Sequence, residues 1–208
     1  MVVNTADLYA IIWVRGKMGN ILIGTCSWTD ATLLASGFYP AHSSTAEERL
    51  RYYSQNFNLV EVDSTYYSLL AERTAEFWCR RTPEDFTFDV KAFSLFTQHP
   101  TQVRSLPKDI RNALSKDTAQ RPRIYYHELP PEIRKELWER FDRALLPLDS
   151  AGKLGVVLFQ FPPWLYPRED NRRYIVQCQE SLPQYRIAVE FRNGAWLSSR
   201  RHPLHFFL

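Results

Sequence analysis

The stretch NLVEVDSTYYS, residues 58–68, carries the pattern that decides the fold. Val60 and Val62 are apolar, and the acidic Glu61 and Asp63 alternate with them. In a closed parallel barrel, one face of each strand packs on helices while the other faces the interior, where polar groups gather near the strand ends. An open doubly wound sheet would instead be apolar on both faces, because helices cover both. The alternation therefore favours a barrel.

Similar strands recur along the chain, separated by amphipathic helices. The other predicted strands are Ile21–Thr25, Phe86–Ala92, Gly155–Phe161 and Arg186–Phe191. The predicted helices lie at 44–57, Glu72–Arg81, Pro130–Leu146 and Asn171–Leu182. Because each connection is long enough for a crossover, the strands are expected to run parallel. We therefore predict an α/β, TIM-barrel-like fold that is incomplete, with about five parallel strands present of the eight in a full barrel.

The two ends of the chain do not fit this pattern. Met18 directly precedes the first predicted strand, so residues 1–17 are interpreted as a non-native N-terminal extension. Residues 18–197 are interpreted as the partial barrel, with an insertion at about 93–129. Residues 198–208 form an atypical tail, which indicates a truncation, with a natural short form as the alternative.

Composition excludes several classes of protein. The chain is 45% hydrophobic and 24% charged, which is typical of a globular domain and not of a disordered chain. A net charge of +3 is too small to indicate nucleic-acid binding by itself. Cys26, Cys79 and Cys178 show neither disulfide nor zinc spacing, and the apolar run Leu8–Val14 is too short to span a bilayer. These features predict a cytoplasmic protein without a membrane partner.

Several linked segments resemble one known family. They are ILIGTCSW (21–28), GFYP (37–40), LVEVDSTYYS (59–68), TPEDFTFDVKAFSLFTQHP (82–100), LGVVLFQFPPW (154–164) and AVEFRNGAWL (188–197). In order and spacing they are similar to the YecE-like family, domain of unknown function family 72 (DUF72). The resemblance implies a TIM-barrel fold and no established activity. It also implies a cleft at the strand ends lined by Asp63, Ser64, Tyr66, Lys91, Gln160, Glu190 and Arg192. The family commonly has asparagine at the position of Asp63.

The candidate site residues follow from this pattern. We predict Asp63, Lys91 and Glu190 as catalytic residues. The predicted ligand-binding residues are Trp28, Ser64, Tyr66, Gln160 and Arg192. Carboxylates beside a lysine can serve as acid, base or nucleophile on a sugar, or hold magnesium or manganese. A structural ion-pair network is the alternative. No metal ligand or cofactor is assigned, because His99 and the other histidines lack zinc-binding spacing.

Together with the resemblance, the residues favour a DUF72-like barrel that binds a small polar ligand or one bearing phosphate or sugar in the strand-end cleft. Acid/base or metal-assisted hydrolysis is the expected chemistry if the protein is an enzyme, a question that the sequence leaves open. A nucleic-acid-binding protein or barrel nuclease is a less favoured alternative. It would use the basic residues of the insertion, Arg104, Lys108, Arg111, Lys116, Arg121 and Arg123. A third alternative is an inactive truncated fragment, and no oligomeric state is predicted.

Overall fold

The computed structural model describes residues 21–197, so the predicted extension at 1–17 and the predicted tail at 198–208 lie outside the described residues. The chain divides into two compact units. Unit 1 contains the described residues up to Ser64, together with Leu70–Val90 and Ala144–Gly155. Unit 2 contains Thr65–Leu69, Lys91–Arg143 and the described residues from Val156 onward.

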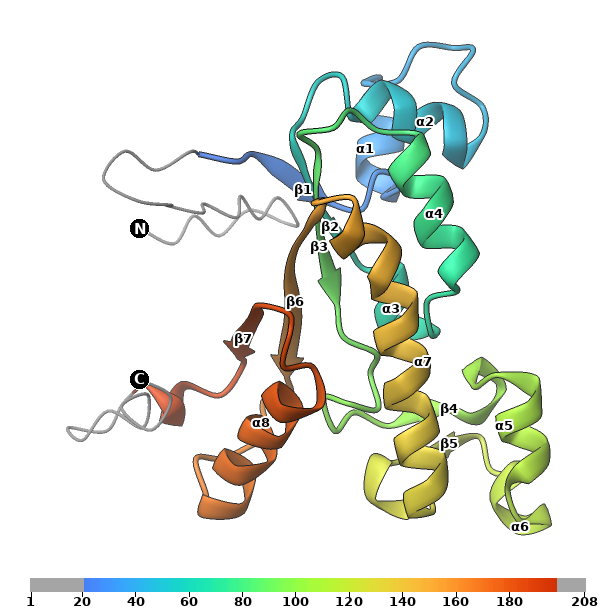
Figure 1. The fold of residues 1–208 in the computed structure, drawn as a ribbon, viewed down its shortest axis with the longest axis vertical. Helices are drawn as coiled ribbons and strands as arrows, with labels where there is room; N and C mark the ends of the chain where they lie inside the picture. The colour runs from blue at the N-terminus through green and yellow to red at the C-terminus, as the bar shows by residue number, and fades with distance from the viewer. Residues whose placement is uncertain (1–20, 198–208) are drawn as a thin grey trace. The chain divides into compact units, whose positions relative to one another are not determined.

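Parallel strands alternate with helices along the chain (Figure 1). The five strands of the main sheet are β1 (Gly24–Cys26), β2 (Leu59–Val62), β3 (Thr87–Lys91), β6 (Leu154–Phe161) and β7 (Ile187–Phe191). Their order is β1-β2-β3-β6-β7, and β1 with β2, β2 with β3, and β6 with β7 pair in parallel. The prediction of an α/β protein with about five parallel strands is confirmed.

Among the described residues, three helices lie wholly in unit 1, namely α1 (Ala31–Ala35), α2 (Ala46–Tyr53) and α4 (Glu72–Arg80). Helix α2 begins with a capping box, in which Thr45 Oγ1 accepts from the Glu48 N–H and the Glu48 carboxylate accepts from the Thr45 N–H. It ends at the fully buried Tyr53, whose hydroxyl donates to the Leu59 carbonyl and accepts from the Thr25 N–H. This hydroxyl therefore connects α2 to both β1 and β2.

A close backbone approach fixes the start of β1. A Cβ atom placed on Gly24 would lie 2.0 Å from the Leu59 carbonyl oxygen, so a glycine is required where β1 meets β2. This pairing also corrects the predicted strand Ile21–Thr25. The strand is Gly24–Cys26, and Ile21 and Ile23 are exposed, because an apolar run alone does not determine which residues find a partner strand.

Unit 1 also contains a buried lysine. Lys153 follows the end of α7 (Pro131–Ser150) and is 5% exposed. Its Nζ donates to the Cys79 and Thr82 carbonyls, both at 2.8 Å, and to Thr82 Oγ1 at 3.0 Å. These acceptors lie at the C-terminal end of α4, where the helix dipole favours a cation. Burial lowers the pKa of Lys153.

Helix α7 continues beyond its predicted end at Leu146 and contains Pro147. The proline lacks an N–H and so removes one hydrogen bond of the helix. Burial offsets this loss, because Ala144, Leu145 and Leu148 are at most 1% exposed and continue the apolar stripe through the proline. The predicted end at Leu146 is therefore corrected to Ser150.

Unit 2 holds β6, β7, helix α8 (Glu169–Ser181) and the insertion. The insertion contains short elements of its own (Figure 1). These are β4 (Thr101–Gln102), η1 (Val103–Ser105), α5 (Lys108–Ala113), α6 (Lys116–Ala119), β5 (Arg123–Ile124) and η2 (Tyr126–Glu128). Strands β4 and β5 form an antiparallel pair that closes this segment on itself.

Burial does not alternate along β3, because Asp89, at 2% exposed, is buried together with Phe88 and Val90, and only Thr87 and Lys91 at its ends are half-buried. Strand β2 is buried throughout, and Glu61 is only 6% exposed. All five residues of β7 are half-buried, since this strand has one neighbouring strand within the described part of the chain. No helix between residues 21 and 197 is long and apolar enough to cross a membrane.

Candidate functional site

In unit 1, the carboxyl ends of β1 and β2 bring a thiol and two carboxylates together. Cys26 and Glu61 are register partners in the parallel pair, so their side chains point to the same face of the sheet. Cys26 Sγ donates to Glu61 Oε1 at 3.6 Å. One ligand atom from each of Cys26, Glu61 and Asp63 lies within 4.8 Å of the others. We call this group the Cys26–Glu61–Asp63 trio.

Strained backbone holds the end of β1 beside this trio. Ser27 has a φ of 67°, a left-handed conformation that is unfavourable for a residue with a side chain. Its N–H donates to the Glu61 carbonyl at 2.8 Å, and its Oγ accepts from the Thr29 N–H at 3.1 Å. These bonds offset the strain and keep Cys26 next to Glu61.

The trio has donor atoms that suit a divalent cation. Thiolate and carboxylate ligands are both found in zinc sites, and carboxylates bind magnesium and manganese. The sequence predicted Asp63 as a catalytic residue and placed Glu61 in the same inward-facing group of carboxylates, but it gave Glu61 no assigned role and did not select Cys26. Only the register between β1 and β2 shows that the two belong together, and the sequence does not give this register.

In unit 2, Tyr66, Lys91, His99 and Trp164 form a continuous series of contacts. Tyr66 comes from α3 (Ser64–Tyr67), Lys91 ends β3, and Trp164 follows β6. Lys91 Nζ lies 5.9 Å from the centre of the Tyr66 ring, which lies 5.3 Å from the centre of the His99 ring. The His99 and Trp164 ring centres are 5.6 Å apart. We call these four residues the strand-end cluster.

Part of this cluster is open to solvent. Trp164 is 55% exposed, and Tyr67, whose ring centre lies 5.1 Å from that of Tyr66, is 68% exposed. Large aromatic side chains are normally buried, so two exposed rings beside a cation and an imidazole indicate a surface suited to a ligand.

His99 is held in one orientation as a neutral ring. Burial, and secondarily the charge of Lys91, lowers its pKa to about 4. Thr97 Oγ1 lies within hydrogen-bonding distance of the Ser94 carbonyl oxygen, at 3.1 Å, and of His99 Nδ1, at 2.9 Å. A neutral imidazole has one N–H donor and one lone-pair acceptor, so the ring can both donate and accept a hydrogen bond.

The backbone just before His99 is also strained, since Gln98 has a φ of 60°. From the sequence, His99 is predicted only to be a loop histidine without zinc-binding spacing. No periodic signal connects it to Lys91 or Tyr66, because the loop that folds it back has no regular pattern.

Gln160, Glu190 and Arg192 form a second polar group in unit 2. Gln160 and Glu190 are register partners, and Gln160 Nε2 donates to Glu190 Oε2 at 2.7 Å. Arg192 Nε lies 2.6 Å from Glu190 Oε1. One carboxylate oxygen of Glu190 therefore accepts a hydrogen bond and the other forms an ion pair, which fits a side chain that positions its neighbours. A catalytic role for Glu190 stays a prediction.

The remaining predicted residues lie in unit 1. Trp28 is 8% exposed, its ring contacts Trp78 edge to face at 5.4 Å between centres, and its Nε1 donates to the Ala46 carbonyl. These contacts give Trp28 a packing role in the core. Ser64 is exposed at the start of α3, and Asp63 is half-buried.

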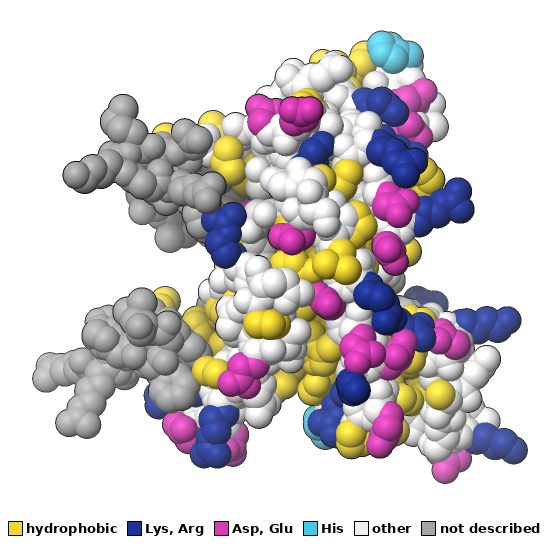
Figure 2. Space-filling view, in the orientation of Figure 1, with side chains coloured by type: hydrophobic (Ala, Val, Ile, Leu, Met, Phe, Trp, Pro, Cys, Tyr) yellow, Lys and Arg dark blue, Asp and Glu magenta, His cyan; other side chains and the backbone are white. Residues whose placement is uncertain are grey.

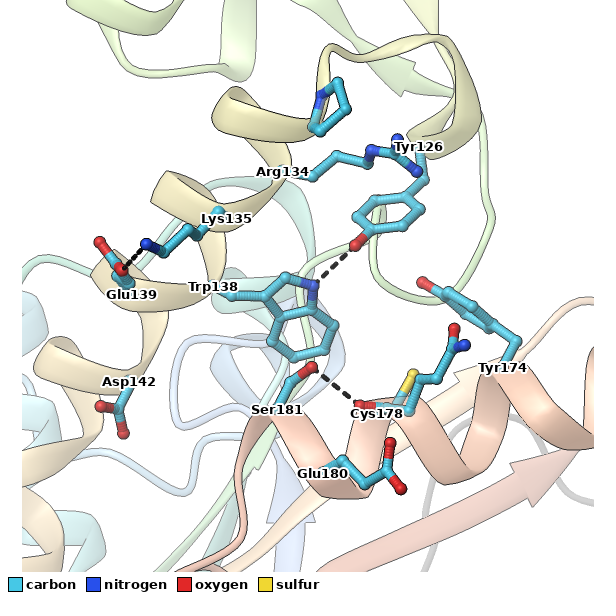
Figure 3. A pocket seen from close by; sticks show the side chains of 12 residues that line it. Tyr126, Arg134, Lys135, Trp138, Glu139, Asp142, Tyr174, Cys178, Glu180 and Ser181 are labelled. Carbon is cyan, nitrogen blue, oxygen red and sulfur yellow. Dashed lines mark hydrogen bonds and ion pairs between the residues drawn. The ribbon is translucent and has the colours of Figure 1, made fainter.

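A cavity of about 520 Å³ lies elsewhere in unit 2, between α7 and α8 (Figure 3). Trp138 and Tyr126 line it, and Trp138 Nε1 donates to the Tyr126 hydroxyl at 2.9 Å. Lys135 and Glu139, also on its lining, pair at 3.6 Å. None of the catalytic or ligand-binding residues predicted from the sequence lines this cavity. Its lining contains both acidic and basic side chains, so it favours neither an anionic nor a cationic ligand.

Comparisons with known proteins agree with the fold and the motifs. A family model described as "Protein of unknown function DUF72" matches residues 22–208. The UPF0759 protein YunF of Bacillus subtilis (strain 168) is 32% identical over 178 residues, which cover 86% of this chain and 52% of YunF. The chain thus spans about half the length of the curated relative it matches.

Two solved DUF72 structures share the fold. One, from Enterococcus faecalis V583, matches with a TM-score of 0.58 and 22% identity over 80% of this chain and 56% of its own. Another, from Thermotoga maritima MSB8, matches with a TM-score of 0.57 and 26% identity over 88% of this chain and 60% of its own. The prediction of a TIM-barrel-like fold is confirmed.

Proposed function

Since the chain belongs to the DUF72 family, whose description states no function, we propose one from the chemistry of its side chains. The proposed function is the binding of a small polar ligand that bears a sugar ring and a phosphate group, at the strand ends of unit 2. The observation that carries the proposal is the strand-end cluster of Tyr66, Lys91, His99 and Trp164.

Each part of such a ligand has a matching side chain. The Lys91 ammonium attracts a phosphate, and the exposed faces of Trp164 and Tyr67 suit the apolar face of a sugar ring. The neutral His99 ring can form a hydrogen bond with a sugar hydroxyl. A cation, a neutral imidazole and two aromatic faces together select a phosphorylated sugar over an apolar molecule.

Proton abstraction by His99 is less well supported than binding. A general base works best when its pKa lies near the working pH, and the pKa of His99 is about 4. The neutral ring is present at pH 7 but is weakly basic. His99 is therefore proposed as a residue that binds and orients the ligand.

Binding to sugar phosphates tests this function directly. Isothermal titration calorimetry with ribose 5-phosphate and glucose 6-phosphate should give saturable binding by the unmodified chain. Lys91→Met and Trp164→Ala should each weaken it by about tenfold or more. The matched control Lys135→Met removes an exposed lysine from α7 and should leave binding unchanged. If the Lys91→Met and Lys135→Met variants bound the sugar phosphates with equal affinity, the proposal would be refuted.

Metal-assisted hydrolysis is a second candidate, favoured by the Cys26–Glu61–Asp63 trio. A cation held there would supply Lewis-acid chemistry, and it would activate water without needing a stronger protein base. Calorimetry with Mn²⁺ and Zn²⁺ should show one site, which Glu61→Gln weakens and the control Cys79→Ser leaves intact. Metal affinity unchanged by Glu61→Gln would exclude the trio as the site.

A further inference from the structure

The insertion of unit 2 contains a cavity of about 430 Å³ with four arginines on its lining, Arg104, Arg111, Arg121 and Arg123. No acidic side chain lines it. Figure 2 shows basic side chains, dark blue, projecting from the part of the molecule that includes α5 and α6. We call this feature the arginine cavity.

Local structure brings these four residues together. Arg123 lies on β5 opposite Gln102 of β4, and the Val103 N–H donates to the Pro122 carbonyl at 3.2 Å. Arg104 lies on η1, where its Nε donates to Gln102 Oε1 at 2.6 Å. Arg111 lies on α5, and Arg121 follows α6. The β4–β5 pair thus folds the segment so that arginines about twenty residues apart in sequence face one space.

The cations of the cavity are poorly neutralised by the protein. Among the residues described, Arg121 has an acidic partner, Glu128 at 2.7 Å, and the other three arginines have none. The Nε of Arg111 is buried and has no hydrogen-bond partner within residues 21–197. Several guanidinium groups around one space repel each other. An anion in the cavity would relieve this repulsion.

We propose that the arginine cavity binds a compound that carries two or more linked phosphate groups. The planar guanidinium group matches phosphate oxygens in pairs, and four such groups exceed what a single phosphate needs. No aromatic residue lines the cavity, so it offers no surface on which a base could stack. The recognised part is therefore the phosphate chain, as in inorganic tripolyphosphate. This site is separate from the strand-end cluster and does not depend on the proposed function.

Calorimetry with inorganic tripolyphosphate tests the proposal. The full chain should bind it, and affinity should fall as salt rises from about 50 to 200 mM. Arg111→Gln and Arg123→Gln should each weaken binding by about tenfold or more. Arg123 is exposed, so its replacement should leave the fold intact. The control Arg173→Gln removes an exposed arginine of α8 and should have no effect.

Other outcomes distinguish the source of the phosphate. Tight binding of an oligothymidylate to the same arginines, with no binding of tripolyphosphate, would assign the cavity to a nucleic-acid backbone and overturn the proposal. If Arg123→Gln and Arg173→Gln weakened tripolyphosphate binding equally, the loss would be explained by the change in net charge, and the proposal would also be overturned. Lys91→Met should keep tripolyphosphate binding, which separates this site from the strand-end cluster.

Discussion

The neutral His99 predicts a loss of stability in mild acid. In the unfolded chain its imidazole takes up a proton near pH 6.5, whereas in the folded protein its pKa is about 4. Between these two values the unfolded state holds more protons than the folded state, so the free energy of unfolding falls as the pH falls. The contribution of His99 is complete above about pH 6.5 and is lost by about pH 4.

The size of this effect follows from the two pKa values. Their difference corresponds to at most about 3.4 kcal/mol, since each pKa unit is worth roughly 1.4 kcal/mol. His99 is only half-buried, and solvent screens part of that energy, so the expected loss is about 1–2 kcal/mol. Glutamine cannot be protonated in this range, so His99→Gln should be free of this loss.

Urea unfolding at a series of pH values from 4 to 7 measures the effect. The stability advantage of the unmodified protein over His99→Gln should shrink by about 1–2 kcal/mol between pH 7 and pH 4. His42→Gln, which removes an exposed histidine, tests whether the loss of any histidine gives the same result. Parallel pH profiles for the unmodified protein and His99→Gln would refute the account of a buried, neutral imidazole.

Further predictions concern stability. Lys153→Met removes three hydrogen bonds at the end of α4 and should lower the free energy of unfolding by about 2–4 kcal/mol in urea titrations, whereas exposed Lys135→Met should change it little. Similar losses in both variants would contradict this. Gly24→Ala should lower the melting temperature, because its Cβ would collide with the Leu59 carbonyl, and an unchanged value would mean that β1 can shift freely. Ser27→Gly should raise stability by up to about 1 kcal/mol by relieving the positive φ, and destabilisation would show that its side-chain hydrogen bonds outweigh the strain.

The sequence predicted the parallel strands well because their alternation of apolar and polar residues is a local property. The predicted first strand began at Ile21, whereas β1 begins at Gly24. The difference arises because β1 is defined by the pairing of Gly24 with Leu59 of β2, a contact between residues distant in sequence. The sequence prediction also stopped α7 before Pro147, where burial decides in favour of the helix.

The site residues divide in the same way. Asp63, Lys91 and Glu190 lie at or near the ends of strands, so their positions could be predicted, and Gln160 and Glu190 are register partners. The contacts of His99 depend on the path of an irregular loop, and the placement of Arg104 and Arg123 around one cavity depends on the β4–β5 pairing. Neither leaves a periodic trace in the sequence. The sequence could therefore predict basic residues in the insertion but could not predict that four of them line one cavity.

The division into two units has a consequence for how this chain can be cut. The polypeptide passes between the units after residues 64, 69, 90, 143 and 155, so neither unit is a continuous segment that a gene fragment could encode. A nick at the exposed Gln120 would leave unit 1 dependent on Ala144–Gly155 from the second piece, and unit 2 dependent on Lys91–Gln120 from the first. Two such pieces, each unable to complete a core, are suited to fragment complementation: structure should return only when both are mixed.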